Sequence, residues 1–133
     1  MGLFGKFRRG KGNQIDLDER SPKLGVKYRD LILMNEIAKQ ATDLSAPRHV
    51  LFYLYAPAKE LGELLATEAR RRGFEATVRE PSPDDCPDDS GSWSIVCETH
   101  TVLSADFVRD SVDFFEALAD RHKAEYDGWE AAA

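Results

Sequence analysis

The chain has 133 residues, of which 42% are hydrophobic and 32% charged, and its formal net charge is −6. This length supports one domain with a single core, and the composition is that of a globular protein. The acidic balance argues against general nucleic-acid binding, which needs a basic surface, and no apolar run approaches the roughly 18 residues of a membrane span. We therefore expect a cytoplasmic protein that does not bind nucleic acid directly, of either monomeric or oligomeric state.

Residues 1–20 differ in composition from the rest of the chain. They hold four glycines and a cluster of cations among few apolar side chains: Gly2, Gly5, Gly10, Gly12, Lys6, Arg8, Arg9 and Lys11. Such a segment buries too little apolar surface to offset the entropy of ordering it. We expect a flexible basic arm at 1–20, either a solubilising tail or a contact for an anionic surface, followed by one domain at 21–133.

The first predicted elements are a helix and a strand. Residues 27–43 repeat apolar side chains close to helical spacing: Tyr28, Leu31, Ile32, Met34, Ala38 and Ala41. Pro47 ends this helix, because the residue before a proline avoids the helical region. Residues 49–55 are dense in β-branched and aromatic side chains, which predicts a central strand.

A second helix and strand follow directly. Pro57 suits the first turn of a helix that runs to Arg72. Its predicted buried stripe is Leu61, Leu64, Leu65 and Ala69. Gly73 is placed to end the helix, and residues 74–79 alternate apolar and polar side chains, as a half-exposed strand does.

The last part of the chain repeats this order. Residues 80–91 form a turn rich in proline and aspartate, and residues 93–102 alternate as a strand. Ser104 is a good N-cap for a helix at 105–123. The final segment, Glu125-Tyr126-Asp127-Gly128-Trp129-Glu130, places two large aromatic side chains around a glycine. We expect it to dock onto the sheet as the last strand, since Tyr and Trp bury large areas.

The predicted order is one helix followed by strand–helix–strand–strand–helix–strand. This order is that of a ferredoxin-like α+β plait, in which a four-stranded antiparallel sheet carries two helices on one face. The last strand of such a plait lies beside the first. We therefore predict a ferredoxin-like domain with an extra N-terminal helix.

Few side chains point to catalysis or to metal binding. His49, His100 and His122 show no metal-ligand spacing with one another or with the two cysteines. The aspartates between positions 84 and 89 do not follow the alternation of a calcium-binding loop. Ser104 lies near His100 in the sequence, but its role as a helix cap explains this proximity without a catalytic triad. We expect no enzyme, no metal and no cofactor.

The last predicted helix carries a row of acids at steps of three or four residues, which we call the acidic row: Asp106, Asp110, Asp113, Glu116 and Asp120. Neighbours at these steps share one helix face and repel each other by about 0.2–0.5 kcal/mol per pair. Arg109 is placed to offset Asp113. The row is either a plain solvated face or a surface that attracts a partner rich in arginine or lysine.

Several segments of this chain carry a family resemblance. They are the N-terminal helix, Asp43–Tyr55 (DLSAPRHVLFYLY), Arg72–Ala76 (RGFEA) and the terminal motif, Tyr126, Asp127, Gly128, Trp129 and Glu130. The sequence resembles the family of the regulator of ribonuclease E activity, B type, over about residues 28–130. This resemblance implies a ferredoxin-like fold and inhibition, by protein–protein contact, of the endoribonuclease that drives RNA decay. It also implies a binding module without chemistry of its own.

Two hypotheses for the function follow. The first is a non-catalytic regulator that binds an endoribonuclease, or its arginine-rich scaffold, through the acidic row. The alternative is a sensor that binds a small molecule or a nucleotide on the open face of the sheet. Exposed aromatic side chains on the strands would favour this alternative, and Tyr53 and Tyr55 are the residues that distinguish the two.

Overall fold

A computed structural model describes residues 16–41, 45–81 and 92–132. Its elements are α2 (Tyr28–Gln40), β1 (Arg48–Ala56), α3 (Lys59–Arg71), β2 (Glu75–Arg79), β3 (Trp93–Thr101), α4 (Ala105–Arg121) and β4 (Glu125–Ala131). The predicted order of helices and strands is confirmed. The predicted arm up to residue 15, and the turn at 82–91 with its aspartates, lie outside the described residues.

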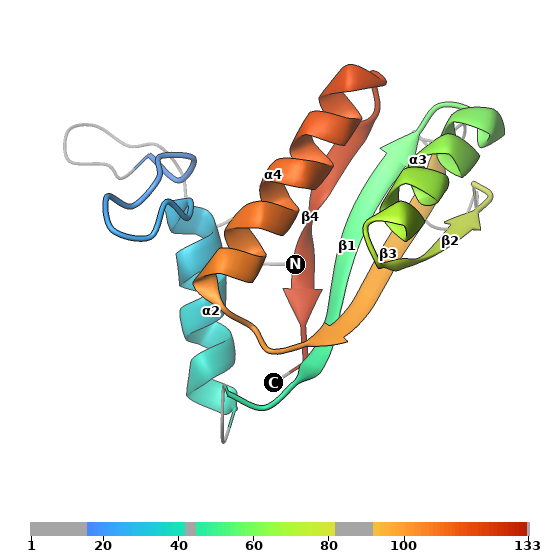
Figure 1. Ribbon diagram of the computed structural model, residues 1–133. Coiled ribbons are helices and arrows are strands. Elements are labelled where there is room, and N and C mark those ends of the chain that lie inside the picture. The colour runs from blue at the N-terminus through green and yellow to red at the C-terminus, as the bar shows by residue number, and fades with distance from the viewer. Residues whose placement is uncertain (1–15, 42–44, 82–91, 133) are drawn as a thin grey trace.

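The four strands form one antiparallel sheet in the order β2-β3-β1-β4. This is the strand order of a ferredoxin-like plait, and it confirms that the last strand lies beside the first. Helices α3 and α4 pack on the same face of the sheet, α3 towards β2 and α4 along β4 (Figure 1). Helix α2 is the addition to the plait and lies beside α4 (Figure 1).

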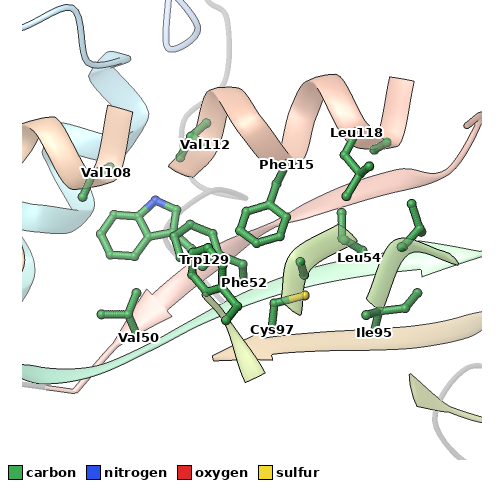
Figure 2. Close-up of a cluster of buried hydrophobic side chains, with 14 of the residues drawn as sticks. Val50, Phe52, Leu54, Ile95, Cys97, Val108, Val112, Phe115, Leu118 and Trp129 are labelled. Carbon is green, nitrogen blue, oxygen red and sulfur yellow. The ribbon is translucent and has the colours of Figure 1, made fainter. Parts of the chain in front are cut away.

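The core lies between the helices and one face of the sheet. The side chains of β1 alternate, so that Val50, Phe52 and Leu54 are fully buried beneath the helices. The Phe52 ring lies 4.8 Å from that of Phe115 and 6.3 Å from that of Trp129, measured between centroids. Figure 2 shows these rings together between the sheet and α4. Trp129 of the terminal motif is therefore a core residue.

A β-bulge in β4 places both aromatic side chains of the terminal motif on the core side. In a regular strand, positions 126 and 129 would point to opposite faces, because side chains alternate. Here Tyr53 pairs with Gly128 and Leu54 pairs with Tyr126, so Asp127 is the extra residue of the bulge. Gly128 has a φ of +113°, which a residue with a Cβ adopts only with strain. The glycine thus turns the strand so that Tyr126 and Trp129 both face the helices.

Two predicted helix faces are shifted in the structure. In α3, Leu64 is 41% exposed, whereas Gly62, Leu65, Ala66 and Ala69 are buried. In α2, the buried residues are Asp30, Leu33 and Ile37 rather than the predicted apolar stripe. The α2 prediction failed because an aspartate occupies the core-facing line of the helix. A buried carboxylate needs a specific partner, which hydrophobic spacing does not reveal.

The predicted ends of the helices agree with the structure. The Ser104 Oγ accepts a hydrogen bond from the Phe107 N–H at 3.1 Å, so this serine is an N-cap as expected. Gly73 follows α3 with a φ of +101°, and its N–H donates to the Arg70 carbonyl. Both contacts satisfy backbone groups that a helix end leaves without a partner.

Residues 16–27, which we call the N-terminal loop, fold back against the start of α2. The N–H groups of Tyr28 and Arg29 donate to the carbonyls of Glu19 and Leu17, each at 3.0 Å. Arg20 and Lys27 form an isolated antiparallel bridge. The last residues of the predicted arm, 16–20, are therefore ordered in the structure. The reason is hydrogen bonding of the backbone, since these residues supply little apolar surface.

We expect Trp129→Ala to lower the free energy of unfolding by about 3–5 kcal/mol, the usual range for truncating a buried aromatic side chain. The substitution leaves a cavity beside Phe52, and it removes a hydrogen-bond donor from the core. Urea denaturation followed by circular dichroism measures the change. In a Trp93→Phe background, the fluorescence of Trp129 should be shifted to the blue of free indole.

Trp93→Phe alone is the matched control, since Trp93 is only half-buried at the start of β3. It should change the free energy of unfolding much less than Trp129→Ala does. An unfolding midpoint for Trp129→Ala equal to that of wild type would contradict the placement of Trp129 in the core.

Candidate partner-binding site

The acidic row lies along the outer face of α4. Its side chains range from 81% exposed at Asp106 to 38% exposed at Glu116. Arg109 lies between Asp106 and Asp110 and contacts both carboxylates, at 3.1 and 3.0 Å. The expected pair between Arg109 and Asp113 is therefore wrong. Arg109 instead partners the two acids nearest to it in the helix.

The other cations of the row come from the N-terminal loop. Arg20 forms an ion pair with Asp113, and Lys27 forms one with Glu116. The Lys27 side chain is only 13% exposed, so this pair is better shielded from water than the others. Asp120 is exposed and forms no ion pair with any residue in the described part of the chain. Five acids thus face three cations, and the row keeps an acidic excess.

The terminal motif is joined to α2 by a buried hydrogen bond. The Trp129 Nε1–H donates to the Asp30 Oδ1 at 2.9 Å. Asp30 is 4% exposed and lies in the first turn of α2, where the helix dipole favours a negative charge. The bond satisfies the indole N–H, which a buried tryptophan otherwise leaves without a partner.

Burial raises the pKa of the Asp30 carboxyl above its ordinary value of 3.8, and the nearby Glu116 adds to this effect. The hydrogen bond from Trp129 and the charges of Lys27 and Arg29 act in the opposite direction and are the weaker influence. The folded protein therefore holds a proton on Asp30 more tightly than the unfolded chain does.

A cavity of about 360 Å³ opens where α2, α4, β4 and the N-terminal loop meet. Its lining residues are Asp18, Lys27, Arg29, Asp30, Val112, Glu116, Tyr126, Asp127 and Gly128. Three of these residues belong to the terminal motif and one to the acidic row. The structure thus brings together, through Glu116 and Tyr126, two features that are separate in the sequence. We call this space the junction cavity.

The junction cavity contains a hydroxyl group without a hydrogen-bond partner. The Tyr126 Oη is buried, and within the described ranges no group forms a hydrogen bond with it. Burial raises the pKa of Tyr126 well above its ordinary value of 10.0, with contributions from Asp30 and Glu116. The Tyr126 ring is parallel to that of Phe115, which holds the side chain in place.

The sequence predictions missed Asp30, Lys27 and Arg29 as members of this site. A signal for Asp30 was present, because it precedes Leu33 by three residues and Ile37 by seven, on the same line of the helix. No sequence signal marks Lys27 or Arg29. Their positions depend on how the N-terminal loop packs against α4.

The remaining motif residue, Glu130, lies on the opposite face of the sheet. The Tyr53 hydroxyl donates to the Glu130 Oε1 at 2.6 Å. Tyr53 and Tyr55 point away from the helices, as the sensor hypothesis requires. Both side chains are half-buried rather than exposed, so they do not supply the exposed aromatic surface that would favour this alternative.

Neither a membrane-spanning helix nor a metal-binding cluster is found within the described ranges. No helix there combines the length and the apolar composition that crossing a membrane requires. No group of three or more histidine, cysteine, aspartate or glutamate side chains in those same ranges is arranged to hold a metal ion.

The fold and the site define an α+β protein of the ferredoxin-like class, with an acidic helix face that leads into a small polar cavity. Residues 30–131 match the family model described as Regulator of ribonuclease activity B, and the chain belongs to this family. The chain is 28% identical over 100 residues to the Regulator of ribonuclease activity B of Escherichia coli (strain K12), which covers 74% of this chain and 70% of the relative. It is 34% identical over 73 residues to the protein of the same name from Photobacterium profundum, over half of each chain.

We expect Asp30→Asn to remove a pH dependence of stability. Because the pKa of Asp30 is higher in the folded than in the unfolded protein, its contribution to stability is complete below a pH of about 3.8 and is lost as pH rises through the folded-state pKa. The asparagine oxygen can still accept the Trp129 N–H. The unfolding free energy of the variant, relative to wild type, should therefore increase with pH across this window in urea titrations.

Glu36→Gln, which removes one negative charge from the same helix, is the matched control. Its unfolding free energy should stay parallel to that of wild type across the window. If the Asp30→Asn and wild-type curves were also parallel, the raised pKa of Asp30 would be refuted.

Proposed function

We propose that this protein is a non-catalytic, cytoplasmic regulator that binds an endoribonuclease of RNA decay, or an arginine-rich segment of its scaffold, through the acidic row. Membership of the Regulator of ribonuclease activity B family supports a role on a ribonuclease. The observation that carries the binding mode is the excess of acids on the exposed face of α4, where five carboxylates face three cations.

The electrostatics of the row suit a basic partner. Exposed charges of one sign raise the rate at which an oppositely charged partner is encountered, and salt screens this effect over about 10 Å. A basic segment would also compete with Arg20 and Arg109 for the same carboxylates. These two cations are at least one-third exposed, so their exchange for a partner's cations costs little burial.

The cleanest test neutralises the acids that do not hold the N-terminal loop. Asp113 and Glu116 pair with that loop, so their replacement would change the structure as well as the charge. We therefore expect Asp110→Asn with Asp120→Asn to leave the thermal midpoint unchanged. This double variant should associate with the purified endoribonuclease roughly two- to tenfold more slowly at low salt, with a flatter salt dependence. Stopped-flow association at several salt concentrations measures both quantities.

Glu63→Gln with Glu80→Gln is the matched control, because both residues are exposed and lie outside α4. This control loses the same net charge and should associate at nearly the wild-type rate. Equal association rates and salt slopes for the two double variants would show that the acidic row is not the binding surface. A cleavage assay with a structured RNA substrate would show whether inhibition follows binding.

A further inference from the structure

The junction cavity has an unequal balance of charge. Four of its lining residues are acids and two are cations. Each cation already has an acid partner, since Lys27 pairs with Glu116 and Arg29 pairs with Asp18 at 3.0 Å. Asp30 and Asp127 have no such partner, because neither forms an ion pair with a residue that the structure describes. The cavity is therefore short of positive charge.

The cavity is also short of a hydrogen-bond donor. The buried Tyr126 Oη has no partner among the residues described, although buried polar atoms in native proteins nearly always have one. Asp30 accepts one hydrogen bond, from Trp129, and an ionised carboxylate can accept several. A group that fills this space with several N–H donors and a positive charge would satisfy both needs.

We propose that the junction cavity binds the guanidinium group of an arginine side chain supplied by the protein partner. A guanidinium is planar, always charged and presents five N–H donors, which suits a site with a carboxylate and a phenol oxygen as acceptors. Val112 and the Tyr126 ring provide apolar walls for the methylene stem of the side chain. A volume of about 360 Å³ accommodates one such side chain rather than a larger ligand.

The site lies next to the proposed binding surface. Glu116 belongs to the acidic row and also lines the cavity, so a basic segment that follows α4 would reach the cavity opening. The origin of the arginine rests on the proposed function, whereas the chemistry of the cavity does not. The two can therefore be tested separately.

The structure supplies its own reporter for occupancy of the cavity. The Trp129 Nε1–H donates to Asp30, so a ligand that binds the Asp30 carboxylate will shift the indole N–H resonance of Trp129. The chain contains two tryptophans, and Trp93→Phe identifies which resonance belongs to Trp129. The probe is N-acetyl-arginine amide, with N-acetyl-citrulline amide as its neutral isostere.

We expect the arginine probe to shift the Trp129 resonance saturably, with a dissociation constant of roughly a millimolar for a ligand of this size. The citrulline probe should leave it in place. Tyr126→Phe and Asp30→Asn should each weaken binding about tenfold, because each removes an acceptor for the charged donor. Asp110→Asn, which removes an acid of the row outside the cavity, is the matched control and should bind as wild type does.

Equal shifts with the two probes, no shift with either, or a saturable shift with acetate instead would each overturn the proposal. The proposal is also refuted if Tyr126→Phe and Asp30→Asn, each with a wild-type-like spectrum elsewhere, bind the arginine probe as tightly as wild type. If the probe fails while the endoribonuclease still binds, only the cavity proposal is refuted. If the probe binds while the endoribonuclease does not, only the proposed function is refuted.

Discussion

The hydrogen bond from Trp129 to Asp30 is the contact on which the arrangement of the site depends. It joins the last strand to the first described helix across 99 positions of sequence. Without it, α2 would present a buried carboxylate to the core, and β4 would bury an indole N–H without an acceptor, each at a cost of about 1–3 kcal/mol. The bond is therefore a specific link between the ferredoxin-like plait and its additional helix. It also holds Asp30 at the wall of the junction cavity.

A second consequence concerns the acidic row. Along an isolated helix these five acids would repel one another, which opposes helix formation. In the folded protein the N-terminal loop brings Arg20 and Lys27 against α4, so the repulsion is partly offset by contacts between distant parts of the chain. The surface nevertheless keeps its acidic excess. Stability of the helix and attraction of a basic partner are thus compatible, because the compensating cations are fewer than the acids.

The site is assembled from elements that are far apart in the sequence. The bulge at Asp127 and Gly128 turns Tyr126 towards the helices, α2 contributes Asp30, and α4 contributes Glu116. The family match spans residues 30–131 and therefore contains both partners of the Trp129–Asp30 bond. The cavity is consequently a feature of the region that defines the family resemblance, and not of the preceding loop alone.

The amino-acid sequence by itself determined the order of helices and strands, the N-cap at Ser104, the C-cap at Gly73 and the docking of the last strand. These features depend on local periodicity and on the conformational preferences of single residues, which a sequence displays directly. Only the tertiary structure decided which acids of the row are paired, that Asp30 faces the core, and that Tyr126 borders a cavity. Each of these depends on contacts between residues far apart in the chain. Spacing within one helix or strand carries no information about such contacts.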